Sequence, residues 1–154
     1  MSQDRFVLLE PGAVRPGRIP LPPAFAVKAT TDDTEGRFSV LEVTLVQDIP
    51  RHVHRHADEC VYVLDGVLEI EFDDRRHRAP RGTFALLPRG VPHALRGASD
   101  PPPRVLQISS PGGWERYLED LIEAGPAVFT EGRLDPVKVN PIVAKYHIGY
   151  EEQS

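Results

Sequence analysis

The stretch that decides the fold is His52-Val-His54-Arg-His56-Ala-Asp-Glu59-Cys-Val-Tyr-Val-Leu-Asp-Gly66, followed by Gly82-Thr-Phe-Ala-Leu-Leu-Pro88-Arg-Gly90-Val-Pro-His93. His52 and His54 are two residues apart, and side chains at this spacing point to the same face of a strand. A carboxylate, Glu59, follows five residues later, and His93 comes from a separate segment. Because imidazole and carboxylate groups bind divalent transition metals, the stretch predicts a metal site inside a β-rich fold.

Glu59 fits such a site only if the chain changes direction after His54. In one unbroken strand, two residues that are five apart face opposite sides of the sheet. The polar segment 55–58 has the composition of a turn, after which Glu59 opens a new strand that runs to the Asp65-Gly66 turn signal. His93 then enters from another strand, after a turn rich in proline and glycine at residues 88–92.

Short strand patterns separated by turn signals occupy most of the chain. Strands are expected at residues 25–28, 38–46, 60–64, 67–72, 76–78, 83–87, 93–96 and 105–110. This spacing indicates a β-sandwich or barrel. Helical spacing follows over residues 113–125, where Gly125 is the expected C-cap and the apolar stripe consists of Trp114, Tyr117, Leu118, Leu121 and Ile122. A second short helix is expected over residues 135–146.

The two quoted segments resemble the two conserved motifs of the cupin superfamily. The matching residues of the first motif are His52, His54, Glu59 and Gly66, and those of the second are Gly82, Pro88, Gly90 and His93. Val46 stands where the first motif has its first glycine, and Gly97 replaces the last asparagine of the second motif. Both differences affect structural positions and leave the ligand positions unchanged. The likeness covers residues 40–121 well, and the tail resembles that of quercetin-dioxygenase-like cupins.

The resemblance implies an all-β fold: a cupin jelly-roll β-barrel, or double-stranded β-helix, with one or two C-terminal helices. We expect a single domain over residues 1–154. It would consist of a proline-rich N-terminal arm (1–24), a core barrel (38–110) and a helical tail (113–150). We expect the arm to wrap over the surface or cross to a partner subunit, and the resemblance implies a homodimer.

The resemblance also implies that one divalent transition metal ion per chain is bound by His52, His54, Glu59 and His93. The ligand types leave its identity open among iron, manganese, nickel, cobalt, copper and zinc. Glu59 is the expected catalytic residue, because it would also accept a proton. The function implied is that of an oxygenase that uses O2 on a small aromatic or polyketide-like molecule. A metal-assisted cyclase, isomerase or dehydratase without O2 chemistry and a non-catalytic small-molecule-binding cupin remain alternatives.

Other interpretations compete at the histidines. The three motif imidazoles could be hydrogen-bonded core groups, in which case no ion is needed. His54 and His56 have the same spacing as His52 and His54, but their pairing would leave too short a spacing to Glu59 for the motif. His77 lies in a polar hairpin segment and is expected to be solvated, and His147 is expected to be structural or exposed.

The remaining candidate residues have mainly structural interpretations. Cys60 adjoins Glu59 on a strand, so it is expected to face away from the metal as a core thiol. The aromatic residues Tyr62, Phe72 and Phe84 are expected in the core and not in a substrate platform. Gln107 and Ser109 alternate along a late strand, where they could line a pocket.

Bulk composition limits the class of partner. The 154 residues include 18 basic and 23 acidic side chains, for a formal net charge of -5, which argues against nucleic acid or an anionic membrane as the main partner. No apolar stretch approaches the roughly 20 residues of a membrane helix. The single cysteine cannot form an internal disulfide, which fits a reducing compartment, and we expect a cytoplasmic location.

Overall fold

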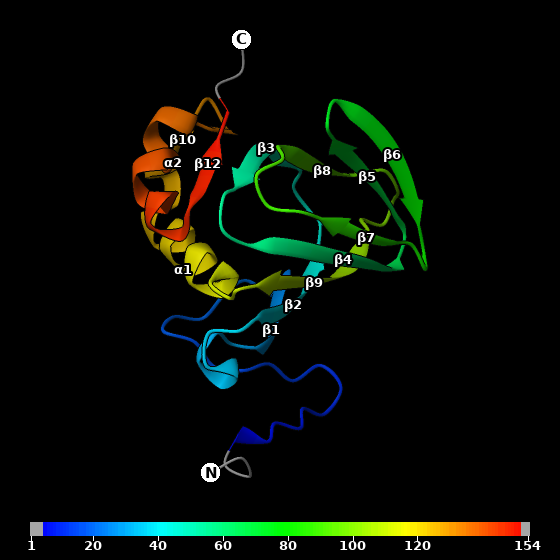
Figure 1. Cartoon of the computed structure of the whole chain (residues 1–154), viewed down its shortest axis with the longest axis vertical. Helices are drawn as coiled ribbons and strands as arrows, with labels where there is room; N and C mark the ends of the chain where they lie inside the picture. Colours follow the sequence, from blue (N-terminus) through cyan, green and yellow to red (C-terminus); the bar gives the residue numbers. More distant parts are fainter. Residues whose placement is uncertain (1–4, 152–154) are drawn as a thin grey trace.

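Two five-stranded antiparallel sheets face each other in the computed structural model, which describes residues 5–151 (Figure 1). The first sheet has the order β1 (Phe25–Ala29), β2 (Ser39–Thr44), β9 (Arg104–Ser110), β4 (Asp58–Asp65) and β7 (Phe84–Leu87). The second has the order β12 (Ile148–Tyr150), β3 (Ile49–His54), β8 (His93–Gly97), β5 (Val67–Phe72) and β6 (Arg75–Pro80). The expected all-β jelly-roll class is confirmed.

The core lies between the two sheets, and the alternation of side chains along the strands produces it. In β4, Glu59, Val61 and Val63 point inward and are buried, whereas Tyr62 points outward. The same period of two buries every second residue of β2 and β9. The interior is therefore built largely from β-branched and leucine side chains, with the polar Glu59 among them.

Two of the expected aromatic core positions are wrong. Tyr62 and Phe84 lie on the outer face of the first sheet, with 43% and 60% of their surface exposed. Cys60 lies on this face too and is only partly buried, so it does face away from Glu59 but is not a core thiol. Phe72 packs against the core as expected. The inward orientation of Glu59 explains why Cys60 and Tyr62 lie on the outer face, because neighbouring residues of a strand alternate between the two faces.

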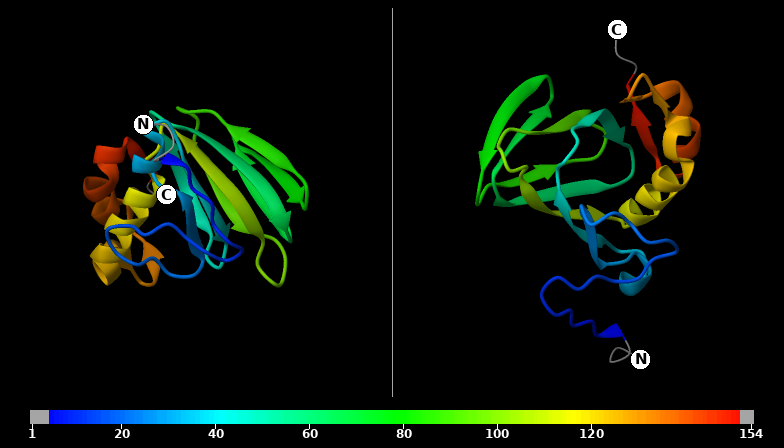
Figure 2. Two further views of the ribbon diagram at one scale, coloured as in Figure 1. Left: turned by 90° about the horizontal axis from the view of Figure 1, so that it is seen from below. Right: turned by 180° about the vertical axis from the view of Figure 1, so that it is seen from behind.

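The C-terminal segment covers one side of the sandwich (Figures 1 and 2). Helix α1 (Trp114–Ala124) ends at Gly125, which has a positive φ, as the sequence predicted. Helix α2 (Pro136–Val143) continues into a short 3-10 turn (Ala144–Tyr146), which confirms the second expected helix. Asp135 caps α2 by accepting a hydrogen bond from the Val137 amide at 3.0 Å. A small hairpin of β10 (Phe129–Thr130) and β11 (Arg133–Leu134) connects the two helices.

The N-terminal segment before β1 contains no strand or α-helix over residues 5–24. It is attached to the body of the molecule at several points. The Arg15 amide donates to the Val27 carbonyl, and the Glu119 carboxylate accepts from the amides of Arg18 and Ile19. The first of the described residues, drawn in dark blue, lie away from the sandwich at the bottom of Figure 1. No helix in the part of the chain that the structure describes is long and apolar enough to cross a membrane.

Candidate metal site

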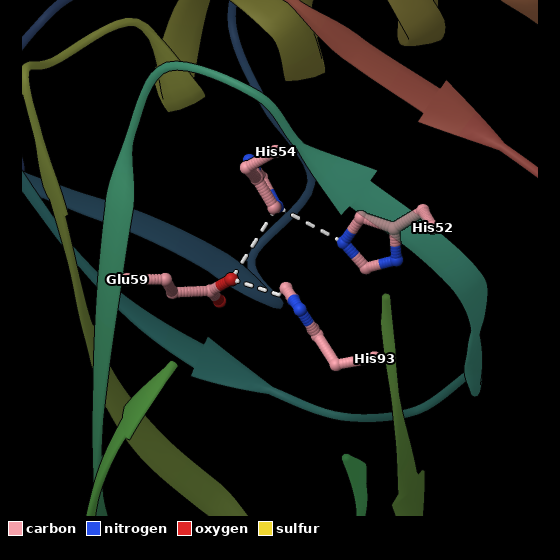
Figure 3. Close-up of side chains that lie close together, drawn as sticks. All are labelled: His52, His54, Glu59 and His93. Carbon is pink, nitrogen blue, oxygen red and sulfur yellow. Dashed lines mark hydrogen bonds and ion pairs between the residues drawn. The ribbon is translucent and has the colours of Figure 1, made fainter. Parts of the chain in front are cut away.

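Four polar side chains meet between the two sheets (Figure 3). His52 and His54 come from β3, and His93 comes from β8, directly opposite His52 in the register of the second sheet. Glu59 comes from β4 in the first sheet. All four are buried, with at most 4% of their surface exposed, and one ligand atom from each lies within 4.8 Å of those of the others. The structure therefore brings together all four residues that the sequence singled out.

The separations between these atoms fit a shared metal ion. The Nε2 atoms of His52 and His54 are 3.0 Å apart, and Glu59 Oε2 lies 3.1 Å from His93 Nε2 and 3.4 Å from His54 Nε2. For bonds of about 2.1 Å, ligands at adjacent positions of an ion lie about 3.0–3.4 Å apart. The donor set of imidazole nitrogens and one carboxylate suits a first-row transition metal, without choosing among such metals.

Backbone carbonyls orient two of the imidazoles. His52 Nδ1 lies 2.7 Å from the Pro50 carbonyl oxygen, and His93 Nδ1 lies 3.3 Å from that of Val91. A carbonyl only accepts, so Nδ1 is the donor in each pair and Nε2 is directed to the centre of the site. Contacts of this kind fix the tautomer and the ring orientation of metal-binding histidines.

The protonation states also suit metal binding. Burial lowers the pKa of His52 to about 3, with further lowering by His93 and His54, and burial lowers the pKa of His54 as well. Burial alone would raise the pKa of Glu59, but its contacts with His93, His54 and His52 outweigh burial and hold that pKa at about 2. At neutral pH the site therefore presents uncharged His52 and His54 rings together with a carboxylate.

Aromatic residues from the C-terminal segment enclose the site. Tyr150 in β12 stacks on His52, with ring centroids 5.1 Å apart, and Trp114 at the start of α1 lies 5.4 Å from the ring of His54. Tyr117 stacks on Trp114 at 4.5 Å, and its hydroxyl is hydrogen-bonded to that of Tyr150. Burial raises the pKa values of both tyrosines, so both remain neutral phenols.

The role of Tyr150 and Trp114 beside the site was not predicted from the sequence. Trp114 was assigned only to the apolar stripe of a helix, and β12 was not predicted as a strand. A usable signal exists for Tyr150 in the sequence, since Ile148 and Tyr150 are two residues apart and would share one face of a strand. Nothing local in the sequence indicates that this short segment pairs with β3.

The other candidate residues lie elsewhere. His56 is exposed and stacks on the exposed ring of His147 at 4.1 Å, so the alternative pairing of His54 with His56 is not what the structure shows. His77 is exposed in β6, as expected. Gln107 and Ser109 are buried on the inner face of β9, where Ser109 is the register partner of Glu59. The amide of Gln107 has no hydrogen-bond partner among the described residues.

Comparison with known proteins agrees with this geometry. The Cupin domain family matches residues 41–109, a range that contains all four clustered residues. Residues 41–109 of the chain form a cupin domain. The fold is similar to that of KdgF from Halomonas sp., with a TM-score of 0.51 and 22% sequence identity over 60% of this chain and 84% of that one.

Two curated relatives match this cupin over part of its length. SchB of Streptomyces halstedii is 32% identical over 77 residues, which are 50% of this chain and 56% of SchB. Quercetin 2,3-dioxygenase of Bacillus subtilis (strain 168) is 43% identical over 47 residues, which are 30% of this chain and 14% of that protein. The chain therefore matches just over half of SchB and a small part of the dioxygenase.

Proposed function

We propose that this cupin is a metal-dependent enzyme, and that it acts as an oxygenase on a small aromatic or polyketide-like molecule. The observation that carries the proposal is the convergence of three buried imidazoles and one buried carboxylate on one point. A buried carboxylate needs a cation or hydrogen-bond donors, and four side chains arranged at the spacing of metal ligands favour a cation. The partial similarity to quercetin 2,3-dioxygenase supports the choice of oxygenase chemistry.

Four protein ligands leave one or two positions free on a five- or six-coordinate ion. A bound ion would supply Lewis acidity and open positions for a substrate oxygen and for O2. His52 and His54 would hold the ion as neutral rings, together with His93 and Glu59. Glu59 would have a second role, because a carboxylate beside the bound substrate can accept a proton from its hydroxyl group.

Metal content is the first test of this proposal. We expect about one transition metal ion per chain in purified protein, measured by inductively coupled plasma mass spectrometry. His54→Ala and His93→Ala should each lower occupancy at least about tenfold, because each removes a ligand. His56→Ala and His77→Ala are matched controls, since both rings are exposed, and they should retain the metal. Full occupancy in His54→Ala and in His93→Ala would contradict the ligand assignment.

Oxygen uptake separates the proposed oxygenase from the alternatives without O2 chemistry. We expect the metal-loaded protein to consume O2 in step with the loss of a phenolic substrate such as a flavonol, measured with an oxygen electrode and by absorbance. Turnover of substrates without O2 consumption would contradict the oxygenase proposal in favour of a cyclase, isomerase or dehydratase. Tight binding without turnover would instead indicate a non-catalytic small-molecule-binding protein.

A further inference from the structure

The aromatic residues beside the metal site continue in a series to the protein surface. Trp114 lies 5.4 Å from the ring of His54, and Tyr117 stacks on Trp114 at 4.5 Å, both measured between ring centroids. Tyr146 meets the ring of Tyr117 edge-on, with centroids 6.4 Å apart. Trp114 and Tyr117 are buried, whereas Tyr146 is partly exposed. The series therefore connects a candidate metal ligand with solvent.

Packing alone does not explain the residue types in this series. It contains the only tryptophan of the chain and two of its four tyrosines. Trp114 Nε1 is buried with no hydrogen-bond partner among the described residues, which costs free energy that a phenylalanine ring would avoid. Tryptophan and tyrosine lose an electron far more readily than phenylalanine does. The series therefore consists of the aromatic side chains that electron transfer requires.

Tyr146 has the surroundings that the end of an electron-transfer path needs. Its hydroxyl donates a hydrogen bond to Asp120 Oδ2 at 2.5 Å. A phenol that loses an electron becomes a strong acid, so a carboxylate at this distance can accept its proton. Tyr146 and Asp120 line a charged hollow at the surface together with Arg18 and Lys145. Small solutes can therefore reach this end of the series.

The two buried tyrosines lack such a proton acceptor. The hydroxyls of Tyr117 and Tyr150 bond to each other and to no carboxylate in the described part of the chain. A neutral phenol is a poor base, so neither hydroxyl can release its proton easily when its ring is oxidised. Of the three tyrosines near the site, Tyr146 is therefore the one that can supply an electron.

We propose that Trp114, Tyr117 and Tyr146 carry oxidising equivalents from the metal site to the protein surface. In the first step, a one-electron oxidant derived from O2 takes an electron from the Trp114 indole. Trp114 then regains an electron from Tyr146 across the ring of Tyr117. The hydroxyl proton of Tyr146 moves to Asp120, which leaves a neutral tyrosyl radical. A soluble ascorbate or thiolate anion supplies an electron and becomes a radical itself, while Asp120 returns the proton.

This path would protect the metal ligands from oxidation. An oxidant that forms without a substrate in place would otherwise react with the nearby imidazoles. The path moves the oxidised centre to Tyr146, where solutes can reduce it. The proposal rests on the proposed function in one respect, since O2 chemistry at the metal would supply the oxidant.

The test generates the Trp114 radical by light and needs no redox chemistry of a metal. Full-length protein with zinc added is suitable, because zinc has no redox chemistry. A laser pulse at the red edge of the tryptophan absorption ionises Trp114 alone, and hexaamminecobalt(III) captures the ejected electron irreversibly. We expect the tryptophan radical absorption to decay as the tyrosyl absorption grows, at a rate that does not depend on protein concentration. This rate should fall in heavy water, because the Tyr146 proton moves with the electron.

Variants and a spin trap locate the radical. Tyr146→Phe should lose the tyrosyl signal, and Asp120→Asn should slow its growth at least about tenfold, because an amide is a much weaker base. Tyr62→Phe is the matched control, since Tyr62 is exposed on the outer face of the first sheet, and it should keep the rate and the yield. Circular dichroism checks the folding of each variant. In the unaltered protein, a nitroso spin trap and peptide mass spectrometry should place the radical on Tyr146, so the test does not depend on the variants alone.

Three results would overturn the proposal: no tyrosyl radical, a rate that rises with protein concentration, or a spin-trap adduct on a tyrosine other than Tyr146. The link to the metal is tested separately. Protein loaded with iron(II) and exposed to O2 without a substrate should carry the adduct at Tyr146. If it does not, while the photochemical results are as expected, the proposed O2 chemistry fails and the path stands.

Discussion

Glu59 and His93 lie on opposite sheets, and Glu59 Oε2 is 3.1 Å from His93 Nε2. The three clustered imidazoles all belong to the second sheet, and Glu59 is the contribution of the first. An ion bound to all four side chains would link the two layers of the sandwich. Metal binding would then stabilise the fold in addition to its role in the reaction, because a ligand that binds only the native state raises the free energy of unfolding.

The variant Glu59→Gln separates these two effects. The amide keeps the volume of the side chain but removes the negative charge, so we expect metal affinity to fall at least about tenfold and turnover to fall further. The free energy of unfolding of the metal-free protein should change by less than about 2 kcal/mol, measured by denaturant titration with a chelator present. The stabilisation on adding metal should shrink with the lost affinity. Unchanged turnover in Glu59→Gln would remove the proposed proton-accepting role.

The ligand cluster could be predicted from the sequence because its information is local. His52 and His54 share a face by their spacing alone, and the polar segment after them signals the turn that brings Glu59 inward. The β-branched residues Val61 and Val63, followed by the Asp65-Gly66 turn signal, also predict β4 as a strand. His93 was identified by the motif around it, since the spacing within one strand says nothing about which strand lies opposite.

The surroundings of the cluster could not be predicted in the same way. Tyr150 reaches His52 only because β12 pairs with β3, and three residues of strand are too few to indicate a partner. For Tyr62 and Phe84, the prediction of a core position from their aromatic residue type was wrong. Both residues occupy positions that alternate with inward-facing neighbours, and an aromatic side chain is compatible with either face of a sheet.

Gly66 at the turn between β4 and β5 is required for two reasons. Its φ of 75° is in the left-handed region, and a Cβ there would lie 2.8 Å from the Cα of Pro103 and 2.7 Å from Ser99 Oγ. Gly82 has a φ of 88°, but a Cβ at this residue would have nothing within 4 Å, so Gly82 isolates the backbone effect. We expect Gly82→Ala to cost about 1 kcal/mol and Gly66→Ala about 2–4 kcal/mol, measured by denaturant unfolding. Equal costs would show that the contact with Pro103 is relieved by a small shift.

Asp33 ties the N-terminal segment to the body of the protein, and its contribution should depend on pH. Its carboxylate accepts two hydrogen bonds from Arg15, at 2.8 and 2.9 Å, and one from the Thr30 amide at 2.9 Å. The hydrogen bonds from Arg15, partly opposed by burial, lower the pKa of Asp33 from 3.8 to about 2. The ionised form is therefore favoured in the folded protein.

The stabilisation by Asp33 should be fully present above pH 3.8 and be lost as the pH falls toward 2, because the unfolded chain takes up the proton first. Allowing for solvent screening, we expect Asp33→Asn to cost about 1 kcal/mol at pH 6 and to flatten the fall in stability below pH 4. The test is to measure the unfolding free energies of the unaltered protein and of Asp33→Asn at pH 6, 4 and 3. A difference that stays constant across this range would contradict a lowered pKa of Asp33 in the folded protein.

We expect a homodimer, because two apolar surfaces of the described chain are exposed. Phe6 and Leu8 in the N-terminal segment are each 77% exposed, and Phe84 and Leu86 of the edge strand β7 are 60% and 56% exposed. Exposed apolar groups of this size favour a protein interface, and an edge strand with apolar side chains is suited to pairing with another chain. Light scattering coupled to size exclusion should give twice the mass of 17.1 kDa.

The variants Phe6→Ser/Leu8→Ser and Phe84→Ser/Leu86→Ser should show which surface forms the dimer. The one that lies in the interface should weaken association at least about tenfold, because apolar anchors carry much of the binding energy. Val137→Ser is the matched control, since Val137 is 67% exposed on α2, away from both surfaces. A monomer for the unaltered protein at tens of micromolar, or a dimer unaffected by both double variants, would exclude these surfaces as the interface.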